Sequence, residues 1–380
     1  MIAFLINELD VRGGTHKQLL KLLEYTEKQG LDFCVITKKI NLDKTYPGFR
    51  KYENKVRLFR HKVRKSIILK FFSNIFSIYI LRKLLNNVDI VNIHDSGFET
   101  LLPAFIGKKT YWQINDLHSC FKVGVSKGKM SLQDRILRSN IILFKSIITD
   151  FIVNVTKNKE RIQTCFRRNA HVFYCGIEPV GIRRNISQSI VRFKDKRLNL
   201  LTSGVFFPYR NYETQVTVIK QLIKKGINAH LNIIGSTELN KEYANSIRKM
   251  VSNEGLAEHI TICGQVNEEE FEQLHQNSDL FLFVNIDQSW GLAVFEAMSC
   301  SIPVIVSRSV GATEILTDET NAIFVDPIDS DEIADAIISL MCNEDVYIQL
   351  ANTSSVFHNL YSWDNAYCSK MIDLMIYGNA

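Results

Sequence analysis

The sequence predicts an α/β protein made of two doubly wound domains. Apolar segments of strand length alternate with segments of helical periodicity, which is typical of parallel sheets covered by helices. Several strand segments end at or beside a glycine, which leaves backbone room at the carboxyl edge of such a sheet. With 380 residues, of which 46% are hydrophobic, the chain is long enough for two domains.

The charge is divided unevenly between the two halves of the chain. Residues 1–185 hold 33 Lys and Arg against 15 Asp and Glu, a net charge of +18, whereas residues 186–380 hold 13 against 25, a net charge of −12. This division supports two domains and indicates that the first half meets something anionic. We expect a first domain, a linker, a second domain and a final helix, at residues 1–180, 181–197, 198–360 and 361–380.

The first domain begins with an apolar strand at residues 1–7. Gly13 and Gly14 then turn the chain into a helix with a leucine core stripe, which ends at Gly30. The G-x-G-x-x-G fingerprint of dinucleotide-binding proteins is absent. Because a glycine pair is a common turn, a plain helix entry is one interpretation of Gly13 and Gly14.

Residues 50–85 are the most basic part of the chain, with 11 Lys and Arg against the single Glu53. Aromatic residues lie between these cations, a combination that suits a helix resting on an anionic membrane surface through residues 50–83. A core helix with a solvated basic face explains the same pattern equally well. Nucleic acid is not expected as a partner, because no helix-turn-helix, zinc or RNA-binding signature accompanies the charge.

Two further strands of the first domain are expected at residues 88–94 and 109–114, and each ends in polar residues. Ligands of open parallel sheets bind at the carboxyl ends of strands. Asp95, Asn115 and Asp116 are therefore candidate residues of an acceptor site. For Asp116, a loop-capping role is an equal alternative. The next segment, residues 178–196, is polar and basic without periodicity, which predicts an interdomain linker.

The second domain restarts the alternation at a strand over residues 198–203, which is followed by Gly204. Later strands end at Gly235 and Gly264, and helices are expected between them. The most informative stretch begins with an apolar strand at 279–284.

A polar loop after that strand leads to Gly291 and a helix over 292–300, which Pro303 cannot continue. A strand, loop, glycine and helix N-terminus in this order present backbone N–H groups to an anion. Glu296 lies on the first turns of that helix, within reach of a hydroxylated group beside a bound phosphate.

These motifs resemble the donor site of retaining GT-B glycosyltransferases of family 4, the glycosyl transferases group 1. Glu296 fills the second Glu of the family's E-x7-E motif, Gln288 stands at the first, and residues 311–314 resemble the following glycine turn. The segment from Gly204 to residue 211 resembles a Gly-Arg…Lys-Asn motif, in which Arg210 replaces the Lys. Val205 stands at the Arg position and cannot hold a phosphate.

The resemblance implies two Rossmann-like domains facing a cleft, with the last helix crossing back to the first domain. It also implies transfer of a sugar from a nucleotide-diphosphate donor to a glycan or lipid-linked acceptor, as in bacterial polysaccharide biosynthesis. The catalytic residues that it implies are Arg210, Glu296 and Gln288. It gives Gly13 and Gly14 a second interpretation, as a turn that faces the donor diphosphate. The donor-binding residues that it implies are Gly13, Gly14, Gly204, Arg210, Gly235, Val266, Gln288, Gly291, Leu292 and Glu296.

The resemblance implies no cofactor and no metal, so protein cations would neutralise the leaving diphosphate. Asn115 stands where the family has a His, and Asn cannot take up a proton. The departures at Gln288, Val205 and Asn115 leave a non-catalytic GT-B-like scaffold subunit as an alternative. A nucleotide-sugar epimerase is a second alternative.

Three features of the sequence indicate the cellular location of the protein. The N-terminus lacks the basic flank and cleavage site of a signal peptide, and no apolar run is long enough to span a membrane. The scattered cysteines form no C-x-x-C pair, so neither a zinc site nor a disulfide framework is predicted. We expect a cytoplasmic protein that is peripheral on the inner face of the membrane.

Overall fold

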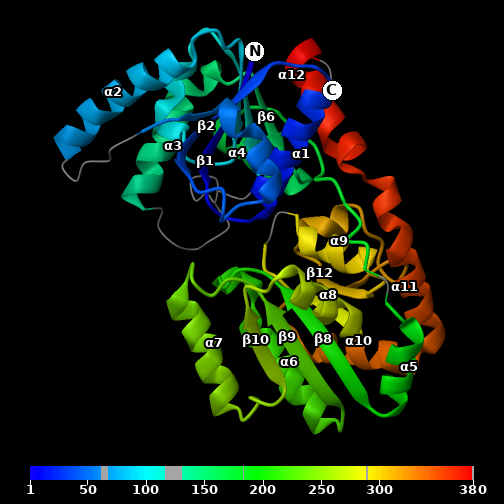
Figure 1. Ribbon diagram of the computed structural model, residues 1–380. Coiled ribbons are helices and arrows are strands. Elements are labelled where there is room, and N and C mark those ends of the chain that lie inside the picture. Colours follow the sequence, from blue (N-terminus) through cyan, green and yellow to red (C-terminus); the bar gives the residue numbers. More distant parts are fainter. Residues whose placement is uncertain (61–66, 116–130, 183, 288–289, 379–380) are drawn as a thin grey trace. The chain divides into compact units, whose positions relative to one another are not determined.

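The computed structural model describes residues 1–60, 67–115, 131–182, 184–287 and 290–378 (Figure 1). The chain forms two compact units, each of which is described by itself. The first unit is Met1–Gly176 together with Trp363–Ala380, and the second is Ile177–Ser362. The first unit is therefore made of two separate stretches of chain, whereas the second is continuous.

Among the described residues of the first unit there is one parallel sheet of seven strands, in the order β3-β2-β1-β4-β5-β6-β7. The strands are β1 (Ile2–Leu9), β2 (Phe33–Ile40), β3 (Val56–Leu58), β4 (Ile90–His94), β5 (Lys109–Ile114), β6 (Asp150–Val153) and β7 (Ala170–Val172). The helical segments are α1 (Gly14–Lys28), η1 (Pro47–Lys55), α2 (Ile67–Leu84), η2 (Glu99–Phe105), α3 (Leu132–Phe144), η4 (Lys145–Ile147), α4 (Thr156–Phe166), η8 (Asp364–Cys368) and α12 (Ser369–Tyr377).

One face of this sheet carries the apolar core of the first unit. Leu5, Ile93 and Trp112 point into a single buried cluster, which Leu81 of α2 and Ile141 of α3 also enter. Both helices pack against η2 on this side of the sheet. The core is thus formed by sheet residues at every second position and by the inner faces of α2 and α3.

The other face of the same sheet buries polar side chains among apolar ones such as Phe4 and Val35. Asn92 and His94 of β4 and Gln113 of β5 alternate with the core residues and are buried. A ring nitrogen of His94, Nε2, lies 3.1 Å from the carbonyl oxygen of Thr15 in α1, so α1 covers this face. Buried polar side chains need hydrogen-bond partners, and here α1 supplies one of them.

The last helix crosses back to the first unit, as the predicted fold class requires. Tyr111 of β5 donates a hydrogen bond of 3.2 Å to the carbonyl of Leu374 in α12. Gly176, where the chain leaves the unit, lies so close to Trp363, where the chain returns, that a side chain at Gly176 would overlap it. The residue at which the chain leaves the first unit and the residue at which it returns therefore pack against each other.

Among the described residues of the second unit there is a parallel sheet of six strands, in the order β10-β9-β8-β11-β12-β13. The strands are β8 (Arg197–Ser203), β9 (Asn228–Ile234), β10 (Ile260–Gly264), β11 (Leu280–Phe283), β12 (Val304–Ser307) and β13 (Ile323–Val325). The helical segments are α5 (Ile186–Lys194), η5 (Pro208–Arg210), α6 (Tyr212–Lys224), α7 (Lys241–Asn253), α8 (Glu268–Asn277), α9 (Leu292–Ser299), η6 (Gly311–Glu314), α10 (Ser330–Cys342), α11 (Glu344–Phe357) and η7 (His358–Leu360).

The structure corrects the expectation of an irregular linker over residues 181–197, because α5 lies within that segment. Ile186, Ile190 and Phe193 pack against the core of the second unit. Their spacing of four and three residues is that of one helical face. The polar and basic residues between them concealed this periodicity in the sequence.

A buried ion pair fastens α5 to the sheet. Asp279, which precedes β11, is fully buried and accepts hydrogen bonds from Arg192 of α5, with Nε 3.0 Å from Oδ1 and 3.1 Å from Oδ2. Its Oδ2 also accepts the backbone N–H of Asn199 in β8 at 2.8 Å. One carboxylate thus joins α5, β8 and β11 at the amino ends of the strands.

None of the helices in the described ranges is long and apolar enough to cross a lipid bilayer.

We expect Asp279→Ala to lower the free energy of unfolding by about 3 kcal/mol, the low end of the range for breaking a buried ion pair, because it leaves the partly buried Arg192 charge and the N–H of Asn199 without their partner. Urea unfolding followed by circular dichroism measures this change. The control is Asp335→Ala, which breaks an exposed pair with Lys225 and should leave the midpoint nearly unchanged. Equal effects of the two substitutions would contradict the role given to Asp279.

Candidate functional site

The candidate site lies where the strand order of the second sheet changes direction. β8 stands between β9 and β11, so the loops after β8 and β11 leave the sheet toward opposite sides. Crevices of this kind at the carboxyl ends of parallel strands are where open α/β sheets bind ligands. Among the predicted donor-binding residues, the loops after β8, β9 and β11 contain Gly204, Arg210, Gly235 and Gly291.

Gly204 and Gly235 bring the ends of β8 and β9 into close backbone contact. The N–H of Gly204 donates to the carbonyl of Ile234 at 2.8 Å, and the N–H of Gly235 donates to the carbonyl of Gly264 at 2.8 Å. Gly235 has a φ of 149°, and a side chain there would overlap the carbonyl of Gly204. Glycine is therefore required at position 235 for two reasons, backbone angle and space.

Arg210 lies directly over Gly204. Its Cζ is 2.5 Å from the place that a Cβ on Gly204 would occupy, so the absence of a side chain makes room for the guanidinium. The same guanidinium lies over the rings of Tyr209 and Phe283, with Cζ 5.2 and 5.8 Å from the ring centres. Aromatic faces attract cations, so these rings hold the charge of Arg210 at the sheet edge.

Asn211 fixes the turn that carries Arg210. It has a left-handed backbone with a φ of 56°, a conformation that Asn tolerates better than most residues. Its side-chain Nδ2 donates to the carbonyls of Val284 at 3.1 Å and Pro327 at 2.5 Å. The turn after β8 is thereby tied to the end of β11.

The start of α9 meets the same ring that Arg210 covers. Gly291 precedes the helix with a φ of 97°, and a Cβ there would lie 2.8 Å from Cε1 of Phe283. Leu292 is the first residue of α9. The guanidinium of Arg210 and the residue before α9 therefore both lie against the ring of Phe283, and both the guanidinium and a helix N-terminus are positively charged groups.

Glu296 lies on the second turn of α9 and is half-buried. Burial lowers the pKa of the nearby His275, and the carbonyl of Phe271 and then the carboxylate of Glu296 oppose this shift. Val266 is half-buried in the loop between β10 and α8. Gln288 falls outside the described residues.

In the first unit, Asp95 and Asn115 come together with the first turn of α1. The backbone N–H of Asn115 donates to Oδ1 of Asp95 at 3.3 Å, and its side-chain Nδ2 donates to Oγ1 of Thr15 at 3.3 Å. Gly13, the residue before α1, has an extended backbone and room for a Cβ, so its own conformation does not require glycine. Gly14 is the first residue of α1, and Asp116 lies outside the described residues.

Behind these residues runs a chain of buried hydrogen bonds that the sequence reasoning missed. Tyr367 donates to Oε1 of Gln113 at 3.5 Å, and Nε2 of Gln113 donates to Oδ1 of Asn115 at 2.9 Å. The chain continues from Asn115 to Thr15, so it joins the returning C-terminal segment to α1. The signal in the sequence was a polar residue at every second position near the ends of two apolar strands.

Burial lowers the pKa of His94 in this polar layer to about 3, and hydrogen bonding to the Thr15 carbonyl opposes the shift. The imidazole is therefore neutral in the folded protein at physiological pH.

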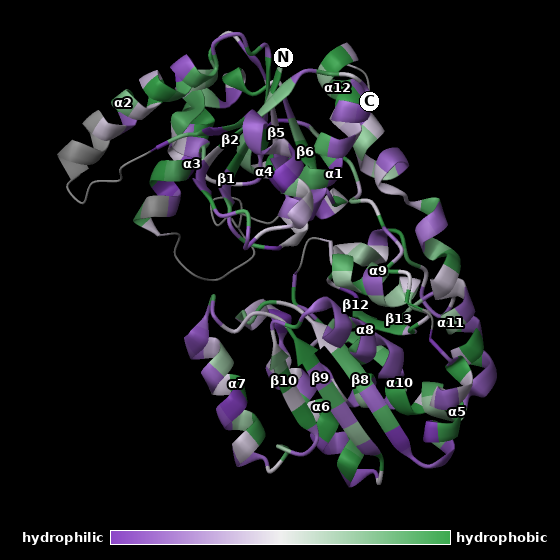
Figure 2. Ribbon diagram, viewed as in Figure 1, coloured by the Kyte–Doolittle hydropathy of each residue, from purple (hydrophilic) through white to green (hydrophobic). Residues whose placement is uncertain are grey.

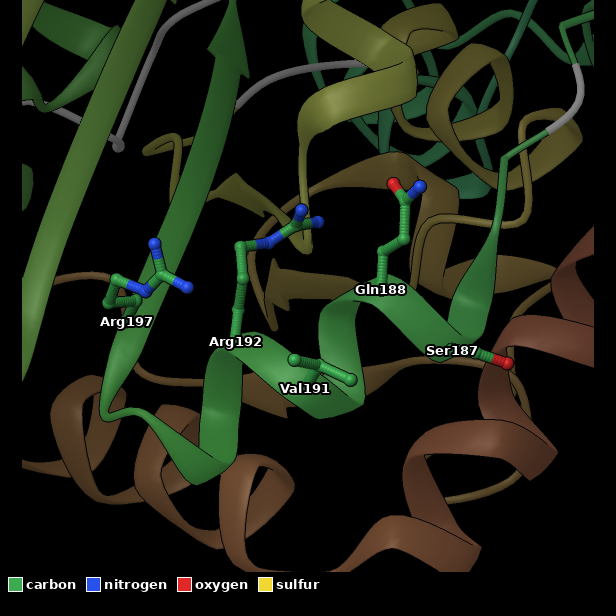
Figure 3. A pocket seen from close by; sticks show the side chains of 5 residues that line it. All are labelled: Ser187, Gln188, Val191, Arg192 and Arg197. Atoms are coloured by element: carbon green, nitrogen blue, oxygen red, sulfur yellow. The ribbon is translucent and has the colours of Figure 1, made fainter.

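No cluster of His, Cys, Asp and Glu suited to a metal ion occurs in the part of the chain that the structure describes. Figure 3 shows a pocket lined by Ser187, Gln188, Val191, Arg192 and Arg197. It lies at the amino end of β8, away from Gly204. Its two arginines already pair with Asp279 and Asp195.

Comparison with solved structures identifies the fold class. The structure of Anabaena HepE in complex with UDP and glucose matches with a TM-score of 0.76 and 14% identity, and the match covers 98% of both chains. The chain thus has the two-domain GT-B fold of glycosyltransferases, and the predicted fold class is confirmed.

The sequence of the second unit matches one family model. Residues 183–355 match the model described as Glycosyl transferases group 1. The second unit is therefore similar in sequence to this family, the one that its motifs resemble.

Curated relatives are similar to part of the chain. An uncharacterized glycosyltransferase of Methanocaldococcus jannaschii, MJ1607, is 24% identical over 56% of this chain and 57% of its own length. The GDP-mannose-dependent alpha-(1-6)-phosphatidylinositol monomannoside mannosyltransferase of Mycobacterium tuberculosis is 28% identical over 36% of this chain and 37% of its own length. The chain thus matches little more than half the length of the first of these relatives and little more than a third of the second.

We expect the stability of the wild-type protein to fall more steeply with acidification than that of His94→Gln. Below pH 6.5 the unfolded chain takes up a proton at His94 that the folded protein does not, so stability is lost as pH falls from 6.5 toward 3. The expected difference in slope is about 1.4 kcal/mol per pH unit. Urea midpoints measured from pH 8 to pH 5 test this, and curves that stay parallel throughout would contradict it.

Proposed function

We propose that the chain is a retaining glycosyltransferase that moves a hexose from a nucleotide-diphosphate sugar to a glycan or lipid-linked acceptor, in biosynthesis of the bacterial polysaccharide type. The observation that carries this proposal is the convergence of Arg210 and the N-terminus of α9 on Phe283. Two sources of positive charge at a glycine-lined strand edge fit a diphosphate. They lie in the unit that matches the group 1 family.

In this proposal the second unit binds the donor. The diphosphate lies between Arg210 and the start of α9 at Gly291 and Leu292, and the nucleoside lies over the loops of Gly235 and Val266. Glu296 accepts hydrogen bonds from the ribose hydroxyls. As the glycosidic bond breaks, negative charge grows on the leaving diphosphate, and groups already aimed at it stabilise that charge without reorganising.

The remaining parts of the mechanism come from the resemblance and stay proposals. The acceptor hydroxyl attacks on the face that the diphosphate leaves, and a donor phosphate oxygen takes its proton, so the enzyme needs no nucleophile of its own. Gln288 would hydrogen-bond a sugar hydroxyl through its amide. Asp95 and Asn115 of the first unit would bind the acceptor. No metal or other cofactor takes part in this scheme.

The experiment that tests the proposal offers donors together with lipid and glycan acceptors extracted from membranes. UDP-glucose and GDP-mannose head the panel, because HepE was solved with UDP and glucose and the mycobacterial relative is named as GDP-mannose-dependent. Mass spectrometry should find an acceptor enlarged by one hexose, and NMR should find the donor's anomeric configuration retained. Nucleotide release without an acceptor would favour an epimerase instead.

A second candidate function is a non-catalytic GT-B-like subunit. Val205 favours it, because this apolar residue precedes the buried Phe206 at the position where the resembled motif has a second cation. Nucleotide binding without transfer to any acceptor would support this candidate.

A lipid-linked acceptor would bring the protein to a membrane, and we propose that residues 50–83 contact anionic lipid. Their described part includes the exposed cations Arg82 and Lys83 at the end of α2. A cytoplasmic location, peripheral on the inner face of the membrane, and the absence of nucleic-acid partners remain predictions.

If Glu296 holds the ribose, Glu296→Ala should weaken binding of UDP or GDP by about 1.5–3 kcal/mol, the range for hydrogen bonds to charged groups. Isothermal calorimetry on the folded variant measures this. The control is Glu272→Ala, which removes an exposed carboxylate of α8. Unchanged affinity in Glu296→Ala would exclude the assignment.

Gly204→Ala should weaken binding of the same nucleotides by a similar amount, about 1.5–3 kcal/mol, because the new methyl group displaces the Arg210 guanidinium. Gly226→Ala is the control for the added methyl group, which meets no atom within 4 Å there, and because the φ of 80° at Gly226 strains an alanine, both variants are first shown to be folded by circular dichroism. If Gly204→Ala binds nucleotide as well as Gly226→Ala does, Arg210 is not a diphosphate ligand.

A further inference from the structure

The outer surfaces of α2 and α3 carry large hydrophobic side chains in contact with solvent. On α2 these residues are Ile75, Phe76 and Tyr79, and on α3 they are Leu132, Ile136, Ile142 and Leu143. Figure 2 shows hydrophobic stretches along both helices. Single exposed hydrophobic residues are ordinary, but a set repeated along two helices requires an explanation.

The exposed residues form a stripe on each helix. Leu132, Ile136 and Leu143 are four and seven residues apart, which places them on one face of α3. Phe76 and Tyr79 are three residues apart on one face of α2. By contrast, the exposed hydrophobic residues of the second unit are spread over different elements, mostly one to an element.

The two stripes face the same side of the first unit. Leu81 of α2 and Ile141 of α3 enter one core cluster on one face of the sheet, and both helices pack against η2. Since the inner faces of the helices point to the same core, their outer faces both turn away from it. We call these outer faces together the α2–α3 surface.

The charge of the α2–α3 surface is positive. Arg82 and Lys83 are exposed and continue the α2 stripe one turn beyond Tyr79. On α3, Arg135 is exposed, whereas the acidic Asp134 bonds to Ser131. The sequence of α2 contains no Asp or Glu.

We propose that the α2–α3 surface docks onto an anionic lipid bilayer. The hydrophobic stripes would enter the boundary between headgroups and acyl chains, and the Arg and Lys side chains would meet lipid phosphates. This goes beyond the predicted contact of residues 50–83, because α3 was not part of it and supplies the larger hydrophobic stripe. The inference rests on the first unit alone and is independent of the proposed transfer reaction.

The test is co-sedimentation of the full chain with vesicles of phosphatidylcholine alone or mixed with phosphatidylglycerol. The variant replaces Ile136 and Leu143 with Ser. Its matched control replaces Val356 and Leu360, which are similarly exposed (56% and 71%, against 60% and 71%) but lie in the second unit. All four side chains are mainly in solvent, so neither variant removes core packing.

The wild-type protein should bind vesicles only when phosphatidylglycerol is present, and binding should weaken as salt rises. Ile136→Ser with Leu143→Ser should lower the partition coefficient roughly tenfold or more, because two hydrophobic anchors are lost. The Val356 and Leu360 control should bind like the wild type.

Three results would overturn the proposal: no binding of the wild type to anionic vesicles, equal binding of wild type and α3 variant, or equal loss in the control. Sedimentation velocity without lipid provides a further test. Self-association that the α3 variant abolishes, with no lipid binding, would assign the surface to a second copy of the chain. No donor or acceptor is added, so failure here does not bear on the proposed transferase activity, and failure of that activity does not bear on the docking surface.

Discussion

The position of the Gly204 carbonyl determines how the loops pack at the carboxyl edge of the second sheet. Gly235 lies against it in a backbone conformation that suits only glycine, and the hydroxyl of Tyr212 donates to it at 2.7 Å. Burial raises the pKa of that phenol, so it remains a hydrogen-bond donor. With this peptide held from two sides, Arg210 can lie over the missing side chain of Gly204 and reach Phe283. The loops after β8 and β9 and the last residue of β11 therefore meet at one position.

The first unit is constructed differently, because one face of its sheet buries polar side chains among apolar ones. Burying an amide such as Gln113 or Asn115 costs folding free energy unless its hydrogen bonds are made. A connected chain of hydrogen-bond partners also fixes the orientation of each amide. The bonds from Tyr367 to Thr15 give these amides a defined direction. The opposite face is mainly apolar and is covered by α2 and α3. One face of the sheet thus adds a directed chain of hydrogen bonds to its packing, whereas the other depends mainly on apolar packing.

Much of the second unit could be predicted from sequence, and the reasons are local. The strand at β11, the helix α9 and the glycines at strand ends follow from apolar runs, Pro303 and turn residues. The helix α5 was missed because its apolar positions are few and lie among polar and basic residues. The meeting of Arg210 and Gly291 on Phe283 could not be predicted, since it depends on the turn that Asn211 ties to Val284. The same holds for the bonds from Tyr367 to Asn115, which join residues far apart in the chain.

The discontinuity of the first unit affects the order in which the protein can mature during synthesis. Residues Ile177–Ser362 form a continuous unit and can acquire their structure as soon as they leave the ribosome. The first unit is synthesised earlier, yet Tyr111 and Gln113 lack their partners until Leu374 and Tyr367 have been made. The N-terminal part of the chain is therefore the last to be completed. Loss of the segment that begins at Trp363 would damage a part of the protein that is translated much earlier.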